Sequence, residues 1–168
     1  MKTKSIATFG MLIALAFILS YIESIIPMPV AIPGIKLGLA NLVVLTALYT
    51  MGPKEAFVLS LIRIILVGFT FGSPSTMLFS LAGGLLSWFL MVMLRKIKSF
   101  SIVGVSVAGG IAHNVGQILT AIWVVDNATI LYYLPFLLIS GVVTGAVIGI
   151  VGSMIVNSIK KFRLINED

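Results

Sequence analysis

The chain has 168 residues, of which 60% are hydrophobic and only 10% charged, and its mean hydropathy is +1.20. A soluble domain carries about a quarter charged residues, so this chain lacks the polar groups needed to cover a water-facing surface. We therefore expect an all-α integral membrane protein whose residues 1–168 form a single domain in the lipid bilayer. The absence of cysteine excludes a disulfide framework. The net charge of +6 comes from basic residues scattered between apolar runs. Such a distribution indicates how a chain is oriented in a membrane, so we expect no nucleic-acid partner.

Six apolar segments are candidate membrane spans, because a span needs about 20 mainly apolar residues. In chain order they are Ser5–Ile26, Leu37–Met51, Glu55–Phe69, Pro74–Leu94, Ser101–Val125 and Ile130–Ser158. The first apolar run is longer than the core of a signal peptide, so we expect an uncleaved helix. The prolines of residues 27–33 exclude a helix between the first two spans and favour an extended lid across the mouth of the bundle.

The basic residues indicate the orientation of this six-helix bundle. If the N-terminus is cytoplasmic, most of the 11 basic residues face the cytoplasm. These are Lys2, Lys4, Lys54, Arg95, Lys96, Lys98, Lys160, Lys161 and Arg163. Lys36 then lies outside and Arg63 lies within a span. The positive-inside rule therefore predicts that both termini are cytoplasmic in a multi-pass protein of the cell membrane.

The few polar groups inside the spans all fall between the midplane and the outer surface on this topology. Ionisable groups within a membrane are costly and usually face a cavity or the bundle interior. We therefore predict an outward-opening pocket for a small-molecule ligand. Its candidate residues are Glu23, Lys36, Asn41, Arg63, His113, Asn114 and Gln117.

Helical spacing places the polar residues of the fifth span on two different sides of the helix. One stripe contains Ser106, Gly110, His113, Gln117 and Thr120. Asn114 points about 100° away from His113, which favours a contact with a neighbouring helix. Alternatively, all of these polar residues have a purely structural role. They would then form hydrogen bonds between helices, and Glu23 would neutralise the charge of Arg63 or Lys36.

Catalysis and metal binding are not expected. One histidine, no cysteine and five acids do not make a typical metal-ligand set. No GxxxxGK[ST] phosphate loop and no catalytic serine motif is present. We expect a protein that is not an enzyme and carries no cofactor, although Glu23, Arg63 and His113 leave a proton relay open.

Small residues form two helix faces. Gly141, Gly145 and Gly149 recur every four residues in the sixth span and favour internal packing. Ala7, Gly10 and Ala14 lie on one face of the first span, which we predict to be an interface for a partner subunit.

Three stretches carry a resemblance to a known family: KLGLAN at 36–41, SVAGGIAHNVGQ at 106–117, and YLP at 133–135 with SGVVTG at 140–145. Across essentially its whole length the chain resembles the Gx transporter family, also labelled heptaprenyl diphosphate synthase component I. That family is similar to the S components of energy-coupling factor (ECF) transporters. The resemblance implies six helices, a vitamin-like ligand near the outer surface, and docking on a transmembrane coupling subunit driven by two ATPases. Gly10 and Ala14 would occupy the docking face, although the family pattern there is AxxxA.

The leading hypothesis is therefore a substrate-binding membrane component of a small-molecule transporter. Flavins, quinone precursors and isoprenoid-like compounds are the ligand classes considered, since Arg63, Lys36 and His113 suit an anionic or carbonyl group. One alternative is a noncatalytic scaffold or accessory subunit of a prenyl diphosphate synthase or electron-transfer complex. The acid-rich diphosphate motif of such synthases is absent from the chain. The other alternative is a solitary proton-coupled carrier.

Overall fold

The computed structural model describes residues 3–26 and 37–165, and these residues form helices with no β-strand among them. The elements are α1 (Thr3–Ile25), α2 (Leu39–Thr50), α3 (Pro53–Thr70), α4 (Pro74–Arg95), α5 (Ile102–Val125), the 3₁₀ helix η1 (Ala128–Tyr133) and α6 (Leu134–Ile165). Each predicted span coincides with an α-helix. The sixth differs in detail, because its first residues form η1 and its α-helix continues to Ile165.

Length separates the helices into two groups. α1, α4, α5 and α6 are long and apolar enough to cross a membrane. α2 is apolar but has only 12 residues, which is about 18 Å of helix against a hydrocarbon core of about 30 Å. α3 has 18 residues and includes Lys54, Glu55 and Arg63, so it is the most polar of the six. The structure thus supports a membrane bundle with four clear spans.

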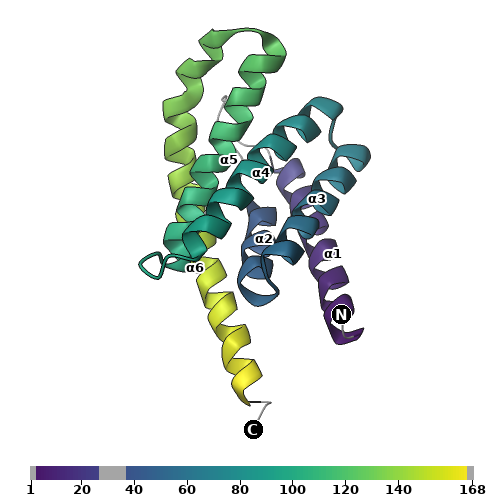
Figure 1. Cartoon of the computed structure of the whole chain (residues 1–168). Coiled ribbons are helices and arrows are strands. Elements are labelled where there is room, and N and C mark those ends of the chain that lie inside the picture. Colours follow the sequence, from purple (N-terminus) through teal and green to yellow (C-terminus); the bar gives the residue numbers. More distant parts are fainter. Residues whose placement is uncertain (1–2, 27–36, 166–168) are drawn as a thin grey trace.

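The chain runs up and down, so that its connections alternate between two ends of the molecule (Figure 1). The start of α1, the α2–α3 turn, the α4–α5 connection and the end of α6 lie at one end, which we call the terminal end. The α3–α4 and α5–α6 connections lie at the other, which we call the opposite end. The basic residues Lys54, Lys96, Lys98, Lys160 and Lys161 belong to the terminal end and are exposed.

Local sequence signals set several helix boundaries. Ser73 and Thr76 form a reciprocal capping box at the start of α4, and Pro74 occupies the first turn. The Ser101 hydroxyl accepts the N–H of Gly104 at the start of α5. Asp126 ends α5 in a left-handed conformation, at φ 52°. These caps hold the ends of the two central helices in place.

Glycines allow α4, α5 and α6 to pack backbone against backbone. A Cβ atom on Gly83 of α4 would lie 2.7 Å from the carbonyl oxygen of His113 in α5. A Cβ atom on Gly145 of α6 would lie 2.7 Å from the Cα atom of Val107. Real Cβ atoms do not approach so closely, so larger residues would force the helices apart. The prediction that the glycines of the sixth span serve internal packing is confirmed.

The terminal end is closed by side chains from α4. Arg95 donates a hydrogen bond to the Leu48 carbonyl near the end of α2, and its guanidinium lies 5.2 Å from the Tyr49 ring centroid. Trp88 donates to the Pro53 carbonyl at 2.9 Å. The buried core lies beside these contacts and includes Ala16, Val43, Val44, Leu45, Ala47, Leu48, Ala56, Leu59, Met91, Val105 and Ile148.

Candidate ligand-binding site

Six of the predicted site residues line one cavity, although they come from four helices. We call this space the polar cavity; its volume is about 50 Å³. Its lining residues are Glu23, Gly38, Asn41, Arg63, Ser80, Gly110, His113, Asn114, Gln117 and Thr144. The structure thus brings together polar groups that are up to about 120 positions apart in the chain. A cavity of this size accommodates a few water molecules or one polar head group of a ligand.

Glu23 connects α1 to the start of α2. Its Oε1 atom accepts a 2.6 Å hydrogen bond from the backbone N–H of Gly38. A carboxylate is favourable there, because the first N–H groups of a helix lack partners within the helix. Glu23 also lines the same cavity as Arg63 of α3. Glu23 therefore has a structural role as well as a place in the cavity wall.

Arg63 and Gln117 line the cavity, and each holds a buried polar atom without a hydrogen-bond partner among the described residues. Within the described ranges, the buried Nε atom of Arg63 and the buried Oε1 atom of Gln117 have no hydrogen-bond partner. Gln117 is only 9% exposed. Buried polar atoms normally have partners, and an unmet one costs about 1–3 kcal/mol. One of these atoms is a donor and the other an acceptor, and both are shielded from solvent.

Asn114 bonds a neighbouring helix, as helical spacing predicts, but it lines the same cavity as His113. The Asn114 Nδ2 atom donates a 2.6 Å hydrogen bond to the Leu137 carbonyl of α6, so this side chain joins two helices while lining the cavity. His113 is half-buried and lines the cavity beside Gln117. In the same stripe, the Thr120 hydroxyl bonds the Gly116 carbonyl of its own helix at 2.9 Å.

A larger space adjoins the polar cavity between α1, α3 and α4. This side chamber has a volume of about 340 Å³ and shares Glu23, Arg63 and Ser80 with the polar cavity. Phe71 in its wall packs against Phe17 and Tyr21, with ring centroids 5.5 Å apart in both pairs. Small-molecule sites measure about 300–1,000 Å³ and are mostly apolar with a few polar groups. The volume of the side chamber lies within that range, and its lining is more apolar than that of the polar cavity.

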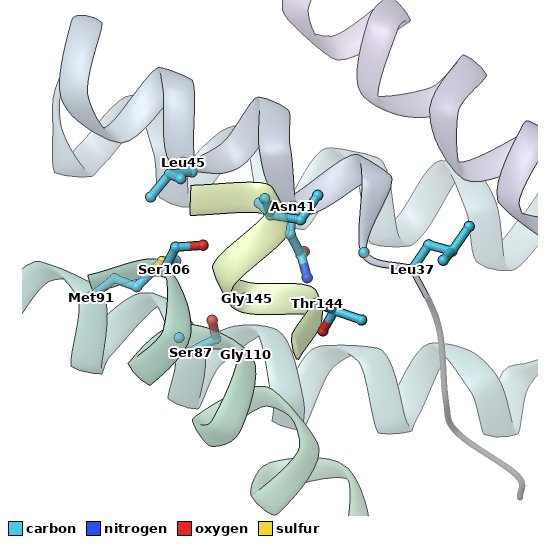
Figure 2. Close-up of a pocket in the computed structure, with 12 residues that line it drawn as sticks. Leu37, Asn41, Leu45, Ser87, Met91, Ser106, Gly110, Thr144 and Gly145 are labelled. Carbon is cyan, nitrogen blue, oxygen red and sulfur yellow. The ribbon is translucent and has the colours of Figure 1, made fainter. Parts of the chain in front are cut away.

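Figure 2 shows the residues that line a third space, among them Leu45 and Met91 of the buried core. This core cavity of about 30 Å³ shares Gly38, Asn41, Gly110 and Thr144 with the polar cavity. Asn41, Ser87 and Ser106 direct polar atoms toward it from α2, α4 and α5 (Figure 2). Both serines are buried. The polar lining therefore extends between the central helices beyond the predicted residues.

The remaining predicted residues fall into two sets. Lys36 and the proposed lid at residues 27–34 fall outside the described residues. Ala7, Gly10 and Ala14 are exposed on α1, and a Cβ atom on Gly10 would meet nothing within 4 Å. Their face is thus uncovered in the isolated chain. The aromatic residues Trp123 and Tyr132 are 78% and 80% exposed, as expected for anchors at a membrane interface.

Sequence reasoning missed several lining residues. Ser80 and Thr144 line the polar cavity, and Phe71 and Met77 line the side chamber. Ser80 precedes the close-packed Gly83 by one helical turn, which is the one signal that pointed to it. Phe71 and Met77 carried no signal, because apolar residues in a membrane helix are indistinguishable from lipid-facing ones by type alone.

Comparison with known proteins matches the chain to a protein family. The family described as heptaprenyl diphosphate synthase component I matches residues 12–155, which is most of the chain. This agrees with the resemblance carried by the stretches at 36–41 and 106–117. No curated protein and no solved structure matches the chain.

Proposed function

The chain belongs to the heptaprenyl diphosphate synthase component I family, and from that premise we propose that it is the substrate-binding membrane component of a small-molecule transporter. The observation that carries the proposal is the convergence of Glu23, Arg63, His113 and Gln117 on one cavity. Arg63 and Gln117 line this cavity, and each holds a buried polar atom without a hydrogen-bond partner in the part of the chain that the structure describes. A purely structural network would satisfy its own buried atoms.

In this proposal all six helices span the membrane and both termini lie in the cytoplasm. Four helices have the required length and composition. The exposed lysines gather at the terminal end, which favours a cytoplasmic location for that end. The polar cavity and side chamber then open toward the outer surface, because Glu23, Phe71 and Thr76 belong to helix segments at the opposite end.

The transport cycle requires partners in this proposal. The resemblance to ECF S components suggests a transmembrane coupling subunit and two ATPases. The exposed small face of Ala7, Gly10 and Ala14 is available for docking. Helices approach closely where small residues meet, so this face suits another membrane helix. We propose that ligand capture at the outer surface is followed by reorientation of the bundle, driven by the partners, without catalysis by this chain.

The family description supports a second candidate, a noncatalytic accessory subunit of a prenyl diphosphate synthase. Such a subunit needs partner contacts but no ligand in the polar cavity. A solitary proton-coupled carrier, the third candidate, would move its substrate when reconstituted alone in liposomes.

Native mass spectrometry of the gently purified protein separates the first candidate from the second. The transporter proposal predicts a small molecule bound to the wild-type chain and lost from Arg63→Ala. A protein with no bound molecule, and with none taken up from a cell extract of small molecules, would favour the accessory subunit. Thr120→Val is the matched control, since that hydroxyl bonds its own helix.

A further inference from the structure

Two buried serines point into the core cavity from different helices. Ser87 of α4 and Ser106 of α5 line this space of about 30 Å³ and direct their hydroxyls into it (Figure 2). We infer that the core cavity is a bound-water site, in which one or two water molecules bridge Ser87, Ser106 and Asn41 and so join α4, α5 and α2. The inference goes beyond the proposed function, because a transporter component and an accessory subunit would hold this water alike.

The hydrogen bonding of the two serines differs from that of other buried hydroxyls. Ser20 and Thr46 each donate to a backbone carbonyl of their own helix, at 2.8 Å in both cases. Hydroxyls in helices commonly make this bond. Ser87 and Ser106 are only 7% and 5% exposed, and within residues 3–26 and 37–165 neither hydroxyl has a hydrogen-bond partner. Because an unmet buried hydroxyl is unfavourable, these two require a partner from outside the chain.

The rest of the cavity wall supplies one further polar side chain that is free to bond. The glycines of the wall have no side chain, and Leu45 and Met91 are apolar. Thr144 lines the cavity, but its hydroxyl already donates to a carbonyl of its own helix at 2.8 Å. The side-chain amide of Asn41 points into the cavity and has no hydrogen-bond partner among the described residues (Figure 2).

The size and chemistry of the cavity favour water over other occupants. A space of about 30 Å³ accommodates one or two water molecules and no organic ligand. A buried water makes about three hydrogen bonds, and the two hydroxyls and the Asn41 amide offer both donors and acceptors for them. None of the lining residues carries a charge, so a metal ion would lack a compensating ligand. Gly38, Asn41 and Gly110 also line the polar cavity, which gives water a route of entry.

A density map of the wild-type protein in a lipid nanodisc, at a resolution that shows ordered water, tests the site. We expect one or two separate peaks within hydrogen-bonding distance of the Ser87 and Ser106 hydroxyls. An empty core cavity would overturn the inference. Density that continues from the core cavity into a larger molecule in the polar cavity would also overturn it.

A double variant links the water to the serines. Ser87→Ala combined with Ser106→Ala leaves a mostly apolar cavity, and apolar cavities stay empty, so the peaks should be lost. Thr46→Val is the matched control, because it also removes a buried hydroxyl, but one that bonds its own helix. The peaks should remain in that variant. Peaks as strong in the double variant as in the wild type would overturn the assignment to the serines.

Met91 offers a second measurement on the wild-type protein, which decides alone if the double variant does not fold. This residue lines the core cavity and is only 6% exposed. X-ray radiolysis forms hydroxyl radicals from water where the water lies, and methionine is readily oxidised to the sulfoxide. We expect mass spectrometry to find Met91 oxidised in spite of its burial. A Met91 that stays unoxidised while the exposed Met154 is oxidised would overturn the inference.

Discussion

The Glu23 carboxylate of α1 accepts a 2.6 Å hydrogen bond from the Gly38 backbone N–H at the start of α2. This contact joins two helices that are separated in the chain by the proline-rich segment. It also places a carboxylate on the wall of the cavity that Arg63 lines. The Glu23 carboxylate thus holds α1 against the start of α2 and contributes an acidic group to the cavity wall.

Replacing Glu23 should lower stability in a graded way. Glu23→Ala removes the acceptor and the charge, and we expect a loss of about 1–3 kcal/mol. Glu23→Gln keeps an acceptor oxygen and should lose less. Thermal unfolding in detergent checks this order, with Ser24→Ala as the control, because the Ser24 hydroxyl bonds its own helix and is exposed. Equal unfolding temperatures for the alanine and glutamine variants would contradict the account.

Arg63 and His113 should affect ligand occupancy more than folding. Both side chains line the polar cavity. We expect Arg63→Ala and His113→Ala to weaken binding of the co-purified ligand at least about tenfold, which corresponds to a loss of about 1.4 kcal/mol. The fraction of ligand-bound protein in native mass spectra measures this. If both variants keep the ligand occupancy of the wild type, the assignment of Arg63 and His113 to the ligand site is wrong.

The close approach of α4 to α5 makes Gly83 sensitive to any added side chain. Gly83→Ala should cost about 1–3 kcal/mol, because its Cβ atom would lie 2.7 Å from the His113 carbonyl oxygen. Gly10→Ala is the matched control on an exposed helix and should be neutral or stabilising by up to about 1 kcal/mol. The unfolding temperature should therefore fall for Gly83→Ala and stay constant or rise for Gly10→Ala. A similar response at both positions would refute the packing argument.

Arg95 should contribute to stability although it carries a charge. Its guanidinium caps the end of α2 through Leu48 and lies over the Tyr49 ring. We expect Arg95→Ala to destabilise the protein by about 1–3 kcal/mol, since it removes a charged hydrogen bond and a cation–π contact. The neighbouring exposed Lys96→Ala should change stability by no more than about 0.5 kcal/mol. Chemical unfolding of the two variants, compared with wild type, provides the check.

The α1 face should be required for partner assembly and not for ligand binding. Gly10→Leu combined with Ala14→Leu adds bulk to an exposed face whose residues line neither the polar cavity nor the side chamber. We expect the coupling subunit to be lost on co-purification while the bound ligand is retained. Val147→Leu with Val151→Leu, on an exposed part of α6, is the control. Normal recovery of a partner with the α1 variant would exclude this face.

The helices were predictable from the sequence because apolar runs are separated by prolines, glycines and basic residues. The boundary between η1 and α6 was not, since residues 128–139 are almost continuously apolar. Apolar character indicates burial in lipid or protein without distinguishing a 3₁₀ helix from an α-helix. Pro135 lies at the start of α6, where its missing N–H is tolerated.

The polar part of the site was also predictable, because polar side chains in a membrane span need a cavity or a partner. Glu23, Arg63 and Gln117 come together as expected. The contact of Glu23 with Gly38 was not foreseen, because it depends on how α1 meets α2 in space. Thr144 was missed since a threonine that bonds its own helix, here the Ser140 carbonyl at 2.8 Å, is common in membrane helices.

A density map of the wild-type protein, gently purified and held in a lipid nanodisc, tests the central claim most directly. The account predicts a non-protein molecule with its polar edge between Arg63 and Gln117 and its body in the side chamber beside Phe71. A map in which the polar cavity holds only water, while a ligand taken up by the protein lies elsewhere, would contradict it.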